Sequence, residues 1–406
     1  MQKALRIIRT DDIIFNLFAC WCLVDTLSGM MSGFLFFSLS QIVKALVAAL
    51  VIFRCSHNQA IVSCVSVMII YLSISVFHSA IIGEDVPATI ILMSKLLTSI
   101  LFFVYFIQVK KSNGRYFEDK AFLVLKWNFL IFSLNIALGL VGIGNSTYNV
   151  EDATVTTIGS HGFIHSTNEM AGVLAVVFSW AFYYFKQHYS FIVYLFLSAL
   201  LFFLAYAMST KAGILATALS FISITYFYGK KNERRVLLLF FIVAVYYAAK
   251  LVQLLLESEV PIVQRFSYFF ERDGLLNALT SGRLGMWEEE RGDYTNSGLL
   301  TLLIGLGGGR TVEMDFYDIL LNCGIVGVVV FGWTYIKMLI SPLKKRIREL
   351  HYIKVIFTSN FLLVVISLIA GHIVFSSMAG MLIALSNALL FGKYGEGKTD
   401  VQIQIV

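Results

Sequence analysis

The chain gathers an arginine and several acids in one short polar stretch, directly before a long apolar segment. Residues 307–321 read GGGRTVEMDFYDILL, so that Arg310 follows three glycines and precedes Glu313, Asp315 and Asp318. A guanidinium offers a fork of donors that matches phosphate oxygens, and a nearby carboxylate could take a proton from a hydroxyl group. These residue types indicate chemistry on a phosphate-bearing ligand, with Glu313 or Asp315 as the candidate catalytic base.

Two further basic residues lie in comparable surroundings. Arg283 follows a glycine in the stretch TSGR, and Lys211 lies in the stretch MSTKAG, in a short turn between two apolar segments. Glycine lets backbone and ligand approach closely because it has no side chain, and nothing else in so short a turn requires a charge. We therefore predict that these two residues and Arg310 bind the phosphate-bearing ligand, with Arg265 as a fourth candidate.

The acids of the same stretch allow two other interpretations. As solvated residues at the start of the apolar segment near residue 316, they would face a helix N-terminus favourably. The pair Glu313 and Asp315 could instead bind a divalent cation through oxygen ligands. We predict no metal site, because the pair stands without a larger group of clustered acids. The run GLGGG is not a dinucleotide-binding fingerprint, since no strand precedes it.

A second polar stretch lies at the entrance to another apolar segment. It reads SHGFIHSTNEMAG and contains His161, His165, Asn168 and Glu169. We predict that these four residues bind the acceptor or its glycan. Asn168 could equally cap the helix that follows it, because asparagine is a favoured N-cap residue.

The elements that position these residues are membrane spans. Of the 406 residues, 58% are hydrophobic and 14% are charged, against about 45–50% and about 25% in soluble domains. Apolar runs recur along the whole chain, and a bilayer core of about 30 Å needs about 20 helical residues. We therefore predict an all-α polytopic membrane protein, with residues 1–406 forming a single integral membrane domain of twelve spans. The spans run near 13–33, 34–53, 60–82, 89–109, 121–143, 169–185, 190–208, 212–228, 236–256, 316–340, 353–373 and 374–392.

The lysines and arginines predict the orientation of these spans. Most of the 31 basic residues fall in alternate short loops, which the positive-inside rule assigns to the cytoplasm. Both termini are then cytoplasmic, and two long loops, 144–168 and 257–315, lie outside. The net charge of +6 is therefore a topology signal, and we expect no binding of nucleic acid.

Two predictions concern details of these segments. Asp25 and Lys44 fall at similar depths on adjacent spans, and they should pair because lone charges in a bilayer are expensive. The loop 257–315 interleaves aromatic and charged residues, which indicates one or two short helices. Its segment 298–306 is too short to span the membrane and could be re-entrant or interfacial.

Four stretches occur in an order that resembles one superfamily of bacterial envelope enzymes. They are FIHSTNEMAG, STKAGIL, SGRLGMW and IGLGGGRTVEMDFYDILLNCGIVG. This ordered set resembles the O-antigen ligases and O-antigen polymerases. The resemblance implies a glycosyltransferase-C-like helical architecture with its site at the large periplasmic loop, on the outer face of the inner membrane.

The resemblance also implies the substrate. Members of this superfamily take their glycan from undecaprenyl diphosphate, and their outer arginines hold the diphosphate; these map onto Arg283, and less closely onto Lys211 and Arg265. We group Arg310 with them. No cofactor is expected, because the diphosphate already activates the donor. The implied partners are the lipid-linked oligosaccharide and the bilayer, together with a chain-length regulator and a flippase.

The same stretches favour a polymerase. Ligases of the superfamily carry a histidine in the large outer loop, whereas this chain has no histidine between His188 and His351. The expected enzyme is an O-antigen or exopolysaccharide polymerase of lipopolysaccharide biosynthesis, which transfers a growing glycan to a lipid-linked repeat unit. The alternatives are a ligase that attaches glycan to the lipid A core and a flippase for lipid-linked glycans.

Overall fold

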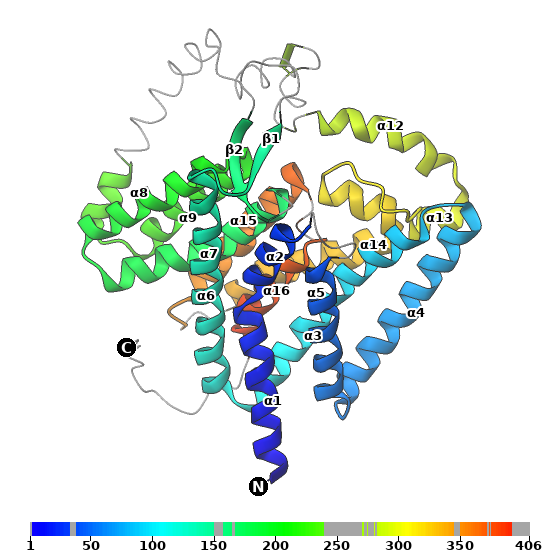
Figure 1. Cartoon of the computed structure of the whole chain (residues 1–406), viewed down its shortest axis with the longest axis horizontal. Coiled ribbons are helices and arrows are strands. Elements are labelled where there is room, and N and C mark those ends of the chain that lie inside the picture. The colour runs from blue at the N-terminus through cyan, green and yellow to red at the C-terminus, as the bar shows by residue number, and fades with distance from the viewer. Residues whose placement is uncertain are drawn as a thin grey trace.

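Helices make up most of the protein (Figure 1). The computed structural model describes residues 2–32, 38–149, 157–164, 167–238, 270–271, 274, 280, 282–344, 350–371, 373 and 375–391. The N-terminal helices are α1 (Gln2–Ala19), α2 (Trp21–Met30), α3 (Leu39–Cys55), α4 (Gln59–Ile82), α5 (Val86–Ser112) and α6 (Gly114–Leu140). After strands β1 (Asn145–Asn149) and β2 (Thr157–Gly162) come α7 (Thr167–His188), α8 (Phe191–Ala207) and α9 (Lys211–Tyr228). The C-terminal part holds α12 (Arg283–Asn296), α13 (Gly298–Ile304), α14 (Asp315–Ile340), a 3₁₀ turn (Ser341–Leu343), α15 (Ile353–Ala370) and α16 (Ser377–Ala388).

Several of these helices are long and apolar enough to cross a membrane. Within the described ranges five qualify: Ile61–Ile82 of α4, α5, α6, α9, and α14 with the turn after it. A sixth is obtained if α1 and α2, which meet at an angle of 53°, form one bent span. Three shorter apolar helices lie in α8, α15 and α16. The chain is thus helical with several membrane-length segments, while the number of twelve spans stays a prediction.

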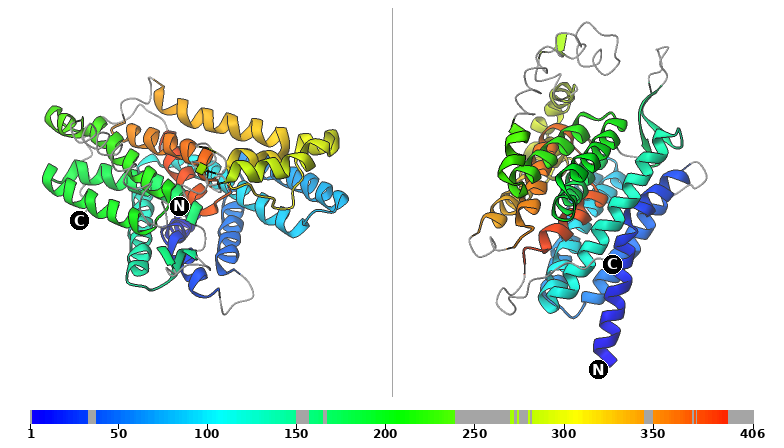
Figure 2. Two further views of the ribbon diagram at one scale, coloured as in Figure 1. Left: turned by 90° about the horizontal axis from the view of Figure 1, so that it is seen from above. Right: turned by 90° about the vertical axis from the view of Figure 1, so that its left-hand side faces the viewer.

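The polar ends of the N-terminal helices lie in two groups (Figure 1). The start of α1, the α3–α4 junction and the α5–α6 junction lie at the lower end of the view, and the hairpin β1–β2 lies with α12 at the upper end. Ion pairs tie the lower group together: Arg54 in α3 bonds to Asp11 in α1 at 2.8 Å. α1 runs beside α6 in both views (Figures 1 and 2). Segments predicted to share one side of the membrane therefore lie together.

Helix α7 is the centre of the bundle. Every side chain from Met170 to Tyr183 is buried, and the helix packs against α9, α15 and α16. A helix that is apolar all round is stable only when other helices surround it. This central helix carries Glu169 in its first turn, so its position fixes one of the predicted site residues.

A two-stranded hairpin stands where the sequence predicted an outer loop in an all-α fold. β1 and β2 pair antiparallel, with Tyr148 opposite Ile158. The hairpin is held to α6, because Asn135 donates a hydrogen bond to the carbonyl of His161 at 2.8 Å and accepts one from the Phe163 amide at 2.9 Å. These strands are short and polar, so they lack the apolar alternation by which a half-buried strand is recognised in a sequence.

α14 is not continuous. Gly324 has φ +62° and ψ −166°, which breaks the helix after two and a half turns. The break lets the end of α13 lie against α14, where the Leu306 amide donates a hydrogen bond to the Leu321 carbonyl at 2.6 Å. The prediction of a short, non-spanning segment at 298–306 is confirmed in its length, since α13 has seven residues.

Candidate functional site

The first feature of the site is an ion pair between Arg283 and Glu313. Arg283 is the first residue of α12, and Gly282 before it adopts the left-handed conformation, φ +87°. Both Nε and Nη2 of Arg283 donate to the same Glu313 oxygen, at 3.2 and 2.9 Å. The arginine side chain is 13% exposed and the glutamate side chain 41%. The pair therefore presents a carboxylate to solvent and keeps the guanidinium behind it.

The backbone at Glu313 is strained. Its φ is +59°, a region that residues with a side chain rarely adopt. Two neighbours hold this conformation: the Glu313 amide donates to Thr311 Oγ1 at 3.1 Å, and Gly371 packs so closely on the Glu313 carbonyl that a Cβ there would overlap it. Such strain costs about 1–3 kcal/mol and is concentrated at functional sites. Glu313 is thus the acid of this stretch with the strongest structural indication of a role.

Asp315 and Asp318 are both buried and engaged by backbone amides. Both oxygens of Asp315 accept from the Ile373 amide, at 3.1 and 3.2 Å, and Asp318 accepts from the Val312 amide at 2.6 Å. They hold the chain around the start of α14, but the interpretation as solvated capping residues is wrong, because both acids are buried and their partners are the amides of Ile373 and Val312, outside α14. In the part of the chain that the structure describes, no group of three or more His, Cys, Asp or Glu residues could hold a metal ion.

Arg310 is surrounded by carboxylates. Its Nη2 donates to Glu84 at 2.6 Å, and its Nη1 donates to Glu290 at 2.7 Å and to Asp293 at 2.9 Å. The hydrogen bonds with Glu84 first, and then those with the other two acids, raise the pKa of Arg310 above its usual value. The guanidinium of Arg310 is therefore occupied by these acids. They join the loop that contains Gly307, Gly308 and Gly309, called the glycine loop below, to α12 and to the α4–α5 turn.

The sequence suggested that the glycines before Arg310 make room for a ligand. In the structure they allow the loop to pack against the α4–α5 turn. Gly307, Gly308 and Gly309 all have positive φ, between +70° and +75°. A Cβ on Gly308 would overlap the Glu84 carboxylate, and one on Gly309 would lie 2.9 Å from the Ala88 side chain. The glycines thus let the loop approach the α4–α5 turn, so their presence does not by itself indicate room for a ligand.

A small apolar cluster fixes α12 over the start of α14. It comprises Tyr294, Leu306, Val312 and Leu321. Beside it the rings of Trp287 and Tyr317 stack, with centroids 4.4 Å apart and an interplanar angle of 25°. This packing determines where the first residue of α12, Arg283, meets Glu313.

The other predicted residues lie at several places. Lys211 is exposed at the start of α9, next to its N-cap Thr210. His161 is buried in β2, and Asn168 lies in the first turn of α7. Arg265 and His165 lie outside the described residues.

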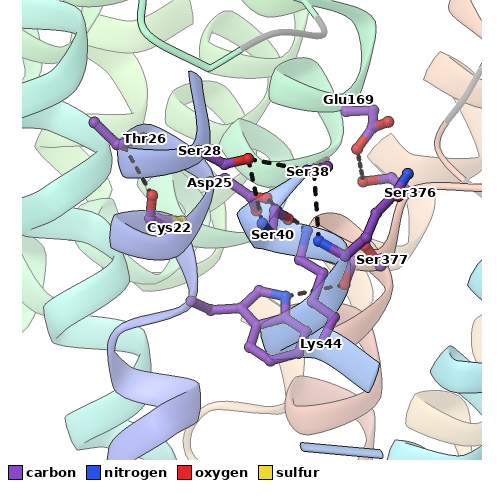
Figure 3. Close-up of polar contacts among 12 residues, drawn as sticks. Cys22, Asp25, Thr26, Ser28, Ser38, Ser40, Lys44, Glu169, Ser376 and Ser377 are labelled. Carbon is purple, nitrogen blue, oxygen red and sulfur yellow. Dashed lines mark hydrogen bonds and ion pairs between the residues drawn. The ribbon is translucent and has the colours of Figure 1, made fainter. Parts of the chain in front are cut away.

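Glu169 joins the site through the connection between α15 and α16. It accepts a hydrogen bond from Ser376 Oγ at 2.7 Å (Figure 3). Its other oxygen lies 3.8 Å from Lys95 Nζ. The same connection carries Gly371 against Glu313 and Ile373 against Asp315. The structure thus brings Glu169 to one end of this connection and Arg283, Glu313 and Asp315 to the other.

Two residues of the site, Glu84 and Lys95, were missed in the sequence. Glu84 lies in the short stretch GEDVP and Lys95 within an apolar span, and neither has a motif around it. The available signals were an acid in a tight outer turn and a lysine inside a span, where an ionisable residue is by default a functional candidate.

Taken together, the structure is a largely helical protein with several segments long and apolar enough to cross a membrane, consistent with a multi-pass membrane protein, and its ion pairs form a charged site. No protein-family model, curated protein or solved structure matches this chain.

Proposed function

We propose that the chain is a polysaccharide polymerase of the bacterial inner membrane. It transfers a growing glycan from undecaprenyl diphosphate to a lipid-linked repeat unit at the periplasmic face. The observation that carries this proposal is the pair Arg283–Glu313, which combines a phosphate-binding guanidinium with an exposed, strained carboxylate. The ordered stretches that resemble the O-antigen polymerases support the same function.

The two residues perform the two tasks that the reaction needs. The diphosphate of the donor takes the place of Glu313 on the Arg283 fork, because charge-assisted bonds to phosphate are at least as strong as those to a carboxylate. The freed Glu313 takes the proton of the acceptor hydroxyl, whose oxygen attacks the anomeric carbon of the donor. The bond from that carbon to the diphosphate oxygen breaks, and undecaprenyl diphosphate leaves with the electron pair. Arg283 neutralises the charge that develops on it.

The other basic residues have distinct roles in this proposal. Arg310 already bonds to three carboxylates, so it positions the glycine loop and α12, and through them Glu313 and Arg283. Lys211 and Arg265 remain candidates for contact with the diphosphate. Of the acceptor-side candidates, Glu169 has the firmest basis, because it shares the α15–α16 connection with Glu313.

The membrane arrangement follows from the positive-inside rule. The chain has twelve spans in a glycosyltransferase-C-like arrangement, with both termini cytoplasmic and the loops 144–168 and 257–315 periplasmic. The position of the start of α1, the α3–α4 junction and the α5–α6 junction together at one end supports this topology for the N-terminal part (Figure 1). Of the two candidate bases, the proposal assigns the role to Glu313, since Asp315 is buried and both of its oxygens accept from one amide.

The test is glycan synthesis by the purified protein in liposomes that contain lipid-linked repeat units. We expect Arg283→Ala, Arg310→Ala and Glu313→Gln to lose the ladder of long glycans while the protein stays monodisperse. Arg291→Ala is the matched control, because Arg291 lies on the same helix and makes only an exposed pair with Glu288. A normal ladder from Arg283→Ala would contradict the assignment of the diphosphate site. A product attached to lipid A core, or transport without synthesis, would contradict the polymerase.

A further inference from the structure

A second cation–carboxylate pair lies at the far end of the α15–α16 connection. Lys95 Nζ in α5 is 3.8 Å from Glu169 Oε1 in α7, and Glu169 Oε2 accepts from Ser376 Oγ at 2.7 Å. Ser376 is the N-cap of α16 and also accepts from the Ala379 amide at 3.0 Å. Helices α5, α7 and α16 therefore contribute to one small polar group, of which Figure 3 shows Glu169 and Ser376.

Lys95 is accessible where a lysine is unexpected. It lies nine residues into the apolar span α5, about 14 Å along the helix from its start, and its side chain is 36% exposed. A charged group that faced hydrocarbon there would cost several kcal/mol, so such residues face the protein interior or an aqueous cavity. By this argument the exposed part of Lys95 should face polar surroundings and not hydrocarbon.

The neighbouring intramembrane pair provides a contrast. Lys44 Nζ bonds to Asp25 at 2.6 Å and lies 5.6 Å from the centre of the Trp21 ring, and its side chain is only 12% exposed. Trp21 in turn donates to the Ser377 carbonyl at 3.1 Å (Figure 3). Lys44 is therefore enclosed beside the α15–α16 connection. Lys95 is more exposed, and among the described residues its ammonium makes one long ion pair.

The two accessible pairs are close enough to serve one reaction. The segment from Gly371, which touches Glu313, to Ser376, which touches Glu169, contains five peptide steps and spans at most about 18 Å. A hydrogen bond from the Ser376 amide to the Ile373 carbonyl shortens it further. Glu313 and Glu169 thus contact the two ends of one short connection.

We propose that Lys95 is the cationic contact for the diphosphate of the acceptor lipid, while Ser376 holds the displaced Glu169 carboxylate beside it. This inference rests on the proposed polymerase, whose reaction needs two lipid diphosphates at once, one on the donor and one on the acceptor. Arg283 holds the first and Lys95 the second. Because the acceptor hydroxyl lies at the far end of an oligosaccharide from its own diphosphate, the two headgroups occupy separate positions.

The chemistry of the pair suits an exchangeable anion. Lysine binds phosphate as a point charge on a flexible stem, so Lys95 can leave its long contact with Glu169 for a phosphate oxygen. Glu169 keeps the bond from Ser376 when this happens. The enclosed Lys44 cannot exchange its partner in this way without exposing Asp25.

The first test measures binding without turnover. Undecaprenyl diphosphate without a glycan is titrated into the purified full chain, and bound lipid is counted by native mass spectrometry. We expect about two lipids per chain in the unaltered protein, about one in Lys95→Gln and about one in Arg283→Ala, with Lys95→Arg keeping both because it retains the charge. Lys337→Gln is the control, because Lys337 is a span lysine that lies over Trp333, away from the site.

The second test needs no variant and so does not depend on the folding of Lys95→Gln. An amine-reactive reagent labels the unaltered protein with and without undecaprenyl diphosphate, and inorganic pyrophosphate is used as a separate addition. We expect the lipid to reduce labelling of Lys95 several-fold. Unchanged labelling of Lys95, or protection by pyrophosphate but not by the lipid, would overturn the inference. A protein that makes glycan ladders while Lys95→Gln still binds two lipids would overturn it and leave the proposed function intact.

Discussion

Arg283 donates two hydrogen bonds to the carboxylate of Glu313, which lies 30 residues further along the chain. The backbone of Glu313 itself adopts the left-handed conformation. The exposed carboxylate is therefore fixed in direction by its backbone on one side and by the guanidinium on the other. Gly371 closes the arrangement from behind, since any side chain there would overlap the Glu313 carbonyl. Three segments that are far apart in the sequence thus converge on one acid.

The strain at Glu313 predicts that two substitutions with the same loss of activity differ in stability. Glu313→Gly and Glu313→Ala both remove the carboxylate, so both should lose glycan synthesis. Only glycine adopts φ +59° without strain, and the left-handed conformation costs other residues about 1–2 kcal/mol. We therefore expect the glycine variant to be more stable than the alanine variant by about 1 kcal/mol, measured by unfolding in detergent. Equal stability of the two variants would show that the backbone at this position relaxes freely.

Arg310 should be more important for stability than a surface arginine. Arg310→Ala leaves Glu84, Glu290 and Asp293 close together without their shared cation. Because Arg310 is partly exposed, we expect a loss of about 2 kcal/mol, below the range for a fully buried pair. The double variant Arg310→Ala/Glu84→Gln should recover part of it, since Glu84 is the least exposed of the three acids. No recovery would mean that repulsion among the acids is not the cause.

The predicted partnership of Asp25 and Lys44 is confirmed, with Nζ and Oδ1 2.6 Å apart and Ser40 donating to the same oxygen at 2.5 Å. Asp25→Asn and Lys44→Met should each destabilise the protein by about 2–3 kcal/mol, because each leaves a largely enclosed charge without its partner. The double variant should cost less than the sum of the two. Purely additive losses would contradict a direct energetic coupling.

Length and hydropathy determined much of the helical fold in advance. The break predicted between 373 and 374 falls within the α15–α16 connection, and α14 begins at Asp315, one residue from the predicted edge. The division of the first span into α1 and α2 at Cys20 was not predicted, because neither proline nor glycine marks that position. The hairpin was also missed, since its anchors are side chains of α6 and a backbone carbonyl of the α8–α9 turn.

The site was predictable in its residue types but not in its pairings. A polar stretch beside glycines identified Arg310 and Glu313, yet the sequence does not tell that Arg310 meets Glu84, which is 226 residues away. It also left Glu313 and Asp315 as equal candidates. Burial separates them, because Asp315 is 1% exposed and bonded to an amide whereas the Glu313 side chain is 41% exposed. Such distinctions depend on tertiary packing, which one sequence does not contain.

The kink in α14 gives a test of the framework that holds the site. Gly324 has φ +62°, and a Cβ there would overlap the Leu303 carbonyl group at the end of α13. Gly332 lies in the same helix with no atom within 4 Å of such a Cβ. Gly324→Ala should therefore displace α13 and the glycine loop, and lower both the unfolding temperature and glycan synthesis. Gly332→Ala should be neutral or stabilising by up to about 1 kcal/mol, because alanine is the better helix former. If Gly324→Ala behaved like Gly332→Ala in both measurements, α13 would not be supporting the loop that carries Arg310 and Glu313.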